Sequence, residues 1–433
     1  MGRIEATWRD GLTRRRALVN LGTLLATSPL LRLSAAGQLD PNPLSAHKRP
    51  LSIDEIVTAF DFEPIFRANV NELVYAYTAH GDGSEFTLRR NREAFSWVDI
   101  IPKAASTPLR SAASTPSGST PAVDPTTVDL SSDVLGVKMK YPIFIAPTAA
   151  QLPLHPDGEV GMRRGALAAA STPMILSGNT SLTVERVAAG ASGGTLWWQH
   201  YPQQDPDTMR ENIERAQAAG FSGVVVTVDQ NSSFYERTQH LANLGGNPRV
   251  AGGRGGGRAG GRGGAAAGVP TGAARYRIAV TRLWYTWTMI DQVRAVVKGP
   301  MLVKGILTAE DARRCLDHGV DGIIVSNHGG RSMDYGPSTL EVLPEIAEAI
   351  NGRIPILIDS GVRRGSDIFK ALALGANAVC LGRASRWALG AFGAPGVQRL
   401  LEIMQRELED AAAGAGCTTL ASINTSRVKT KFV

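Results

Sequence analysis

Short apolar runs rich in Val, Ile and Leu recur between residues 142 and 384, and a segment with a helical pattern follows each of them. Such alternation is typical of βα units that build a parallel sheet. The eight runs are 142–147, 174–178, 195–201, 223–229, 301–306, 322–328, 355–361 and 378–384. Eight βα units in roughly 250 residues predict a closed (β/α)₈ barrel, the TIM barrel.

The clearest helical segments that follow these runs are 205–219, 308–318, 338–350 and 364–374. Residues 51–100 precede the first strand and are predicted to form a helical flap over one end of the barrel.

Two segments interrupt this pattern. Residues 103–127 are rich in Ala, Ser, Thr and Pro, a composition that predicts a low-complexity surface insertion. Residues 244–275 are rich in Gly and Arg and follow the fourth strand. Such a run can bind RNA or an anionic surface, but no aromatic residues are interleaved with the arginines, which favours a flexible loop.

The formal charge of the 433-residue chain is +7, and its distribution decides what this means. The first 36 residues carry six Arg and two acidic residues, and residues 244–275 carry five Arg and no acidic residue. These two segments together hold more positive charge than the net value, so the remainder is not basic. No nucleic-acid partner is expected, and 43% hydrophobic content predicts a large buried core.

The N-terminus resembles a twin-arginine export signal over residues 1–36. Arg14, Arg15 and Arg16 precede an apolar stretch to Leu31, and small residues at 34–36 could allow cleavage. This predicts a folded protein exported to the periplasm. The alternative is a basic amphipathic helix on a cytoplasmic protein, which could associate with a membrane surface. No second apolar run is long enough to span a bilayer.

The three cysteines, Cys315, Cys380 and Cys417, show no metal-ligand spacing, so neither a disulfide nor a metal site is predicted. Cys380 lies in an apolar run and is predicted to be a core residue.

Polar residues stand at the ends of the predicted strands, where barrels collect their chemistry. The main ones are Thr148, Ser177, Gln199, Tyr201, Thr227, Asp229, Lys304, Ser326, His328, Asp359 and Arg383. Core filling would use Val, Ile and Leu at these positions instead.

His328 could be a structural histidine, but Gly329 and Gly330 remove side chains beside it and Arg331 follows, which favours a functional site. Lys304 ends an apolar strand, and a buried ammonium needs an anionic or electron-rich partner. The loops after the last two strands resemble a phosphate site, which by itself indicates only a phosphorylated ligand.

Four segments carry a family resemblance: 144–149 (FIAPTA), 302–306 (LVKGI), 323–331 (IIVSNHGGR) and 359–365 (DSGVRRG). They resemble the FMN-dependent 2-hydroxy-acid dehydrogenases and oxidases, a family that includes glycolate oxidase, lactate oxidase, mandelate dehydrogenase and flavocytochrome b2. The resemblance covers residues 51–427 apart from the two insertions, and it implies a homotetramer.

The resemblance implies FMN as cofactor. The residues implied to bind it are Pro147, Thr148, Ala149, Ser177, Gln199, Thr227, Lys304, Ser326, Asp359, Ser360, Gly361, Val362, Arg363, Gly382 and Arg383. For the substrate, the resemblance implies that Tyr77 and Arg331 hold the carboxylate, to which Arg offers paired donors. It also implies that Tyr201 contacts the substrate hydroxyl or carboxylate.

These roles predict oxidation of a 2-hydroxy acid to a 2-oxo acid. His328 would be the base and FMN the electron acceptor, while Asp229 would orient His328 and Lys304 would stabilise negative charge on the flavin. Oxygen, a quinone or a cytochrome could each reoxidise the flavin.

Two positions depart from the family pattern. Glu236 stands where the family places a second substrate arginine, and the adjacent Arg237 would restore it after a one-residue shift. Asn179 stands where glycolate oxidase has a bulky aromatic residue, which suggests a roomier or more polar pocket.

Two other interpretations stay open at this point. One is a flavin- or phosphate-binding barrel of the IMP dehydrogenase or isopentenyl diphosphate isomerase type, which does not explain His328 and Arg331 together. The other is an exported flavin-binding protein whose Gly/Arg loop binds anionic partners.

Overall fold

The computed structural model describes residues 52–103, 123–229 and 285–432. The chain divides into two units, Met1–Asn42 and Pro43–Val433, and every described residue belongs to the second. The predicted export signal, the Gly/Arg segment and Arg237 lie outside the described residues, as do residues 104–122 of the predicted insertion. The last residues of that insertion form a short 3₁₀ helix, η5 (Pro125–Thr127), capped by Asp124.

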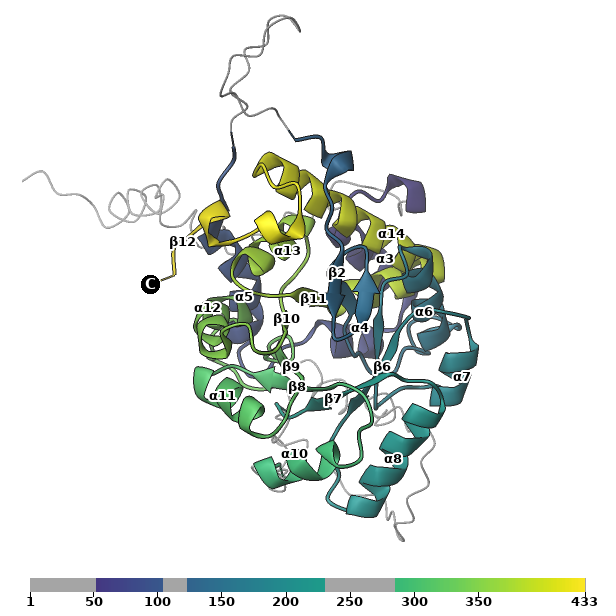
Figure 1. Cartoon of the computed structure of the whole chain (residues 1–433). Helices are drawn as coiled ribbons and strands as arrows, with labels where there is room; N and C mark the ends of the chain where they lie inside the picture. The colour runs from purple at the N-terminus through teal and green to yellow at the C-terminus, as the bar shows by residue number, and fades with distance from the viewer. Residues whose placement is uncertain (1–51, 104–122, 230–284, 433) are drawn as a thin grey trace, which may run out of the picture. The chain divides into compact units, whose positions relative to one another are not determined.

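Eight parallel strands close into a barrel, in which β11 pairs with β4 (Figure 1). The strands are β4 (Ile143–Ile145), β5 (Met174–Ser177), β6 (Leu196–His200), β7 (Gly223–Thr227), β8 (Met301–Ile306), β9 (Gly322–Val325), β10 (Ile356–Ile358) and β11 (Ala378–Leu381). Each strand lies within one of the eight predicted runs. The prediction of a (β/α)₈ barrel is therefore confirmed.

Helices follow the strands and surround the barrel. They are α6 (Gly158–Ala168), α7 (Val184–Ala189), α8 (Pro206–Ala218), α10 (Trp287–Arg294), α11 (Ala309–Asp317), α12 (Thr339–Ile350), α13 (Gly365–Ala373) and α14 (Arg383–Gly414). The four predicted helices match α8, α11, α12 and α13 to within one residue at either end. Their starts are well marked in the sequence because Asp205, Thr308 and Ser338 cap the first turns of α8, α11 and α12.

The inside of the barrel is a closed apolar layer to which each strand contributes one residue or, in the case of β11, two. These residues are Phe144, Ile175, Trp197, Val225, Leu302, Ile324, Leu357, Ala378 and Cys380. A hairpin of β2 (Ser132–Val134) and β3 (Val137–Met139) adds Val134, Val137 and Met139 to the same cluster. Strand residues on the other face pack against the helices. The packed interior leaves the strand ends as the place for a ligand.

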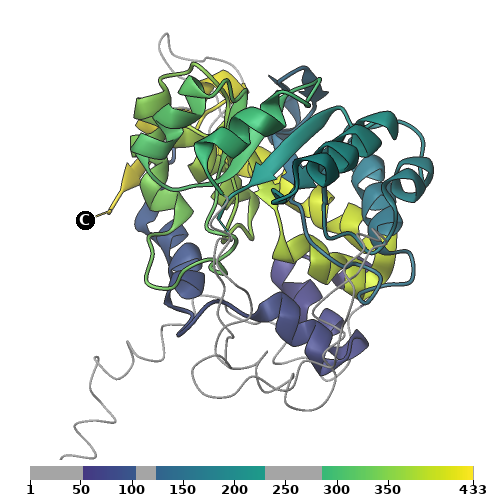
Figure 2. The ribbon, with the colours of Figure 1, turned by 90° about the horizontal axis from the view of Figure 1, so that it is seen from below.

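The predicted helical flap is present. It consists of α3 (Phe62–Asn69), α4 (Glu72–Ala79) and α5 (Phe86–Glu93), and α3 packs against α14 (Figures 1 and 2). The Asp82 backbone N–H donates to the Gly330 carbonyl at 2.8 Å, so the end of α4 contacts the loop that follows β9. The sequence analysis missed one further pairing, in which β1 (Val98–Ile100) runs antiparallel to β12 (Val428–Thr430), beyond the predicted domain end at 427.

A buried ion pair joins the flap to the barrel. Arg92 of α5 donates to Asp367 of α13 at 2.5 Å and to the Gly361 carbonyl at 3.0 Å. The Asp367 side chain is 2% exposed and also accepts from the backbone N–H groups of Arg363 and Arg364, each at 2.9 Å. One carboxylate therefore fixes both the flap and the loop after β10. None of the helices in the described part of the chain is long and apolar enough to cross a membrane.

We expect Asp367→Asn to lower the free energy of unfolding by about 3–5 kcal/mol, because it removes the charge of a buried carboxylate that accepts from Arg92 and from two backbone N–H groups. The matched control is Glu185→Gln, which breaks the exposed pair of Arg215 and Glu185 (2.6 Å) and should cost less than about 1 kcal/mol. Denaturant unfolding of the flavin-free proteins measures both values. Equal losses in the two variants would contradict the role given to Asp367.

Candidate active site

A ring of mostly polar residues lies just above the apolar layer, at the carboxyl ends of the strands. Side chains alternate along a strand, so the residue two positions after each member of the apolar layer also faces inward. Those residues are Ala146, Ser177, Gln199, Thr227, Lys304, Ser326, Asp359 and Gly382. All except Ala146 were predicted to bind the cofactor.

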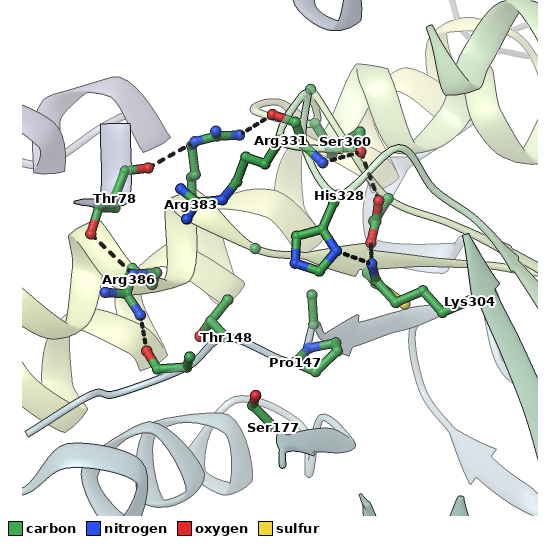
Figure 3. Close-up of a pocket in the computed structure, with 18 of the residues that line it drawn as sticks. Thr78, Pro147, Thr148, Ser177, Lys304, His328, Arg331, Ser360, Arg383 and Arg386 are labelled. Atoms are coloured by element: carbon green, nitrogen blue, oxygen red, sulfur yellow. Dashed lines mark hydrogen bonds and ion pairs between the residues drawn. The ribbon is translucent and has the colours of Figure 1, made fainter. Parts of the chain in front are cut away.

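A pocket opens at this end of the barrel between the strand ends and the flap (Figure 3). Most of the predicted site residues line it: Tyr77, Pro147, Thr148, Ala149, Ser177, Tyr201, Lys304, His328, Arg331, Asp359, Ser360, Gly361, Val362, Arg363, Gly382 and Arg383. Four others, Asp229, Gln199, Thr227 and Ser326, lie outside this lining.

Lys304 is the charged centre of the site. Its side chain is 4% exposed, and its Nζ lies 3.5 Å from Asp229 Oδ2 and 3.7 Å from Asp359 Oδ2. Burial alone would lower the pKa of Lys304, but the two carboxylates outweigh it and raise the pKa. Burial alone would likewise raise the pKa of Asp229, and Lys304 and His328 hold it below its usual value. The ammonium and the Asp229 carboxylate are thus both ionised.

His328 shares this network. Its Nδ1 lies 2.8 Å from Asp229 Oδ1 and 3.4 Å from Lys304 Nζ. Burial lowers the pKa of His328, and although Asp229 opposes this effect, Lys304 adds to it. The imidazole is therefore neutral at neutral pH. The shorter contact to a carboxylate assigns the proton to Nδ1, which leaves Nε2 as a proton acceptor.

The backbone around His328 is held in an unusual conformation. His328 has φ of 59°, and Gly329 and Gly330 follow with φ of 71° and 75°. The His328 N–H donates to Ser326 Oγ at 3.1 Å, and the Gly329 N–H donates to Ser360 Oγ at 3.0 Å. Ser326 therefore positions the turn that carries His328.

The loop after β10 packs closely against the backbone of the flap. Ser360 and Gly361 have φ of 79° and 86°, and a Cβ on Gly361 would lie 2.1 Å from the Asn91 carbonyl oxygen. Arg363 lines the pocket, and its guanidinium lies 4.5 Å from the centroid of the Trp387 ring. A cationic side chain on a tight turn is suited to a phosphate.

Two buried polar atoms beside the pocket have no hydrogen-bond partner among the described residues: Gln199 Nε2 and Thr227 Oγ1. Both residues are 1% exposed, and their strand neighbours Ser177 and Lys304 line the pocket. Since buried polar groups are normally hydrogen-bonded, these atoms require a ligand with polar groups along its edge.

Arg383 lines the pocket and also ties the flap to the barrel. Its guanidinium donates to the carbonyls of Thr78 (2.9 Å), Gly329 (2.7 Å) and His80 (2.7 Å). A guanidinium has five N–H donors, so these three contacts leave donors for a phosphate. The prediction that Arg383 binds the cofactor stays a prediction.

Arg331 and Tyr77 lie together under the flap. Arg331 Nη1 donates to the Tyr77 carbonyl at 2.6 Å and contacts His80 Nδ1 at 3.1 Å, and the guanidinium carbon lies 4.8 Å from the Tyr77 ring centroid. Burial, followed by Arg331 and Arg383, lowers the pKa of His80 to about 2, so His80 is neutral. The remaining nitrogens of Arg331 have no partner among the described residues and are available to an anion.

The predicted site residues did not include Thr78, Ala146, Cys380 and Arg386, which line the pocket. Cys380 was predicted as core and is 1% exposed, but it also borders the pocket. Arg386 follows Arg383 by three residues, and this spacing places both on one side of α14. This spacing was the sequence signal that could have identified Arg386 as a pocket residue.

The buried ammonium of Lys304 and the unpartnered polar atoms of Gln199 and Thr227 suit an electron-rich ring with polar edges. The loops after β10 and β11 suit a phosphate. Together with the barrel, these features define an FMN-dependent oxidoreductase. Comparison with known proteins agrees: the chain matches the family model described as FMN-dependent dehydrogenase over residues 66–430. The chain belongs to this family, and FMN is its cofactor. The residues described above fit that group.

Individual relatives cover almost the whole chain. Glycolate oxidase 3 of Arabidopsis thaliana is 36% identical over 378 residues, which cover 87% of this chain and 97% of that protein. A peroxisomal (S)-2-hydroxyacid oxidase of the same plant is 35% identical over 379 residues, covering 88% and 98%. A crystal structure of mandelate oxidase matches with a TM-score of 0.71 and 33% identity, covering 87% and 99%. The predicted resemblance to FMN-dependent 2-hydroxy-acid oxidoreductases is confirmed.

The charge network predicts opposite shifts of the His328 pKa in two variants. Asp229→Asn removes the carboxylate that raises this pKa and should lower it further, whereas Lys304→Met removes a neighbouring positive charge and should raise it. Nitrogen-15 NMR of histidine-labelled protein measures both shifts. The control Asp291→Asn removes a carboxylate 2.6 Å from His318 and should leave the His328 signals unchanged. A protonated His328 at neutral pH in the unmodified protein would contradict the assignment.

Proposed function

We propose that the protein oxidises a 2-hydroxy acid to the corresponding 2-oxo acid, with His328 as the base and FMN as the electron acceptor. The observation that carries this proposal is the 2.8 Å contact between His328 Nδ1 and Asp229 Oδ1, beside the buried ammonium of Lys304. The relatives named glycolate oxidase and (S)-2-hydroxyacid oxidase support this substrate class.

His328 acts on the substrate through Nε2. The reaction removes two electrons and two protons from the carbinol group. The neutral imidazole would accept one proton, and the other would pass with the two electrons to the flavin. Asp229 then stabilises the imidazolium through Nδ1–H, as the carboxylate of a catalytic triad does. Because burial lowers the pKa of His328, the base is unprotonated before substrate binds.

Arg331 and Tyr77 bind the substrate carboxylate. The Tyr77 carbonyl holds one side of the Arg331 guanidinium, and the other nitrogens are directed to a ligand as charge-assisted donors. Tyr201 lines the same pocket and contacts the substrate hydroxyl or carboxylate. Arg237 is a further proposed carboxylate ligand, and it lies outside the described residues.

FMN supplies the site for the two electrons that leave the substrate. Lys304 stabilises the negative charge that this transfer creates, because its ammonium is already fixed between two carboxylates and needs no reorganisation. Gln199 and Thr227 provide the polar contacts to the ring that their unpartnered atoms require. The loop from Asp359 to Arg363 and the start of α14 hold the phosphate.

The electron acceptor that reoxidises the flavin, the homotetramer and export by the twin-arginine route remain proposals. Oxygen is the first candidate acceptor, since the curated relatives are named oxidases. A quinone or cytochrome would suit an exported enzyme equally well.

Anaerobic reduction of the bound flavin tests the proposed reaction. We expect the yellow absorbance of the purified holoprotein to bleach on addition of glycolate, lactate, mandelate or another 2-hydroxy acid. Reoxidation with oxygen or a quinone analogue then identifies the acceptor. Bound FMN that no 2-hydroxy acid reduces would refute the proposal and leave a flavin-binding protein.

Replacing the base tests the role of His328. His328→Gln should retain FMN but slow flavin reduction by a factor of about 10²–10⁴, the usual contribution of a general base. Stopped-flow absorbance measures the rate. The control His318→Gln alters a histidine at the end of α11, outside the pocket. Its flavin should be reduced at the rate of the unmodified protein. Ordinary turnover by His328→Gln would exclude His328 as the base.

A further inference from the structure

Arg386 is a buried cation of the pocket that the proposed reaction does not yet use. It lies in the first turn of α14, is 4% exposed and lines the pocket on the side opposite Lys304, next to Thr78 (Figure 3). Its Nε donates to Thr78 Oγ1 at 3.1 Å, and its Nη1 donates to the Ala149 carbonyl. Its Nη2 has no hydrogen-bond partner among the described residues. Two protein contacts therefore fix the guanidinium and leave one donor group available.

The surroundings of Arg386 contain an excess of positive charge. Arg331, Arg383 and Arg386 gather around Tyr77 and Thr78, and none of the three forms an ion pair with an acidic residue of the described chain. Burial lowers the pKa of Arg386 to about 10, so it remains cationic at neutral pH. The charge of the buried Glu159 acts on Arg386, but the two residues form no ion pair. A buried cation without an ion-pair partner is costly, which indicates that a ligand supplies further negative charge.

The other anion-binding groups are already assigned. Three backbone carbonyls accept hydrogen bonds from Arg383, and in the proposed function Arg363 and its loop would hold the phosphate of FMN. Arg331 takes the substrate carboxylate in the proposed reaction. Arg386 is the guanidinium that remains, and it faces the same pocket as Arg331.

Tyr77 relates the two guanidinium groups in space. The Arg331 and Arg386 guanidinium carbons lie 4.8 Å and 5.5 Å from the centroid of this one ring. Both groups are thus within reach of a single small molecule. Asn179, a small polar residue, lines the pocket as well and leaves room for a polar substituent.

We propose that Arg386 binds a second carboxylate of the substrate, so that the pocket prefers 2-hydroxy acids with two carboxylates over those with one. This inference rests on the proposed oxidation of a 2-hydroxy acid. It makes Arg386 a specificity-determining residue and leaves the work of His328, Asp229 and Lys304 unchanged.

Equilibrium binding to the FMN-loaded protein tests the inference without turnover. Titration with malonate, succinate and propionate, followed by the change in flavin absorbance, gives dissociation constants for non-oxidisable acids. Arg386→Gln should weaken binding of the better dicarboxylate about tenfold or more, the loss expected for a charge-assisted contact, and leave propionate almost unchanged. The matched control is Arg399→Gln, which removes another α14 arginine that donates to a backbone carbonyl, that of Ile56, outside the pocket. It should change neither constant.

Anaerobic flavin reduction by malate, 2-hydroxyglutarate and lactate provides the second measurement. In the unmodified protein, at least one dicarboxylate should reduce the flavin about tenfold more efficiently than lactate does. Arg386→Gln should remove that preference. Arg386→Lys keeps the charge and should retain part of the preference, which provides a test should the glutamine variant fail to fold.

Three results would overturn the inference. The unmodified protein could show no preference for dicarboxylates, which decides the matter without any variant. Arg386→Gln could weaken mono- and dicarboxylates equally, in which case Arg386 shares the one carboxylate that all substrates carry. The variant could also match the unmodified protein, which would make Arg386 a packing residue. Absence of flavin reduction by every 2-hydroxy acid would instead refute the proposed function itself.

Discussion

The site depends on one buried ion network, in which the Lys304 ammonium lies between the Asp229 and Asp359 carboxylates. These three groups come from the ends of β7, β8 and β10, so their mutual attraction fixes strands that the barrel alone would hold only through backbone pairing. Each charge is deeply buried, and each is tolerable there only because the others neutralise it. The same network orients His328 through Asp229. The same ion network therefore balances the buried charges, joins the strand ends and positions the imidazole of His328.

On the opposite wall of the pocket, the cations are held without carboxylates. Arg383 and Arg331 are held by the backbone carbonyls of Thr78, Gly329, His80 and Tyr77 rather than by carboxylates. Carbonyl oxygens fix a guanidinium in place without cancelling its charge. The flap thereby closes onto the barrel and still leaves a positive surface facing the pocket, whereas the Lys304 side holds two carboxylates and one ammonium. In the proposed reaction, the pocket thus separates a half that binds anions from a half that exchanges protons.

The inward ring of polar residues could be predicted because successive side chains of a strand point to opposite faces of the sheet. If Leu302 and Leu357 face inward, then Lys304 and Asp359, two residues later, must face inward as well. The strands and capped helices were found for the same local reasons. The contacts of Arg383 could not be predicted. Two of its three acceptors lie about 300 residues earlier, in the flap, and all three are backbone atoms that leave no mark in the sequence. The three-residue strands β1, β2, β3 and β12 were missed because they do not stand within longer apolar runs, as the equally short β4 and β10 do.

In the proposed reaction, this division of charge allows a neutral base to serve an anionic substrate. Before substrate binds, burial and the Lys304 ammonium keep the pKa of His328 low, so the imidazole is unprotonated. An anion bound on the arginine side would bring negative charge close to the imidazole and raise the same pKa, while Asp229 remains 2.8 Å from Nδ1 to receive the positive charge. Substrate binding would thus make the proton acceptor stronger. A pocket with Asp229 and Lys304 but no uncompensated arginines would lack this coupling, because it would not draw an anionic substrate to the base.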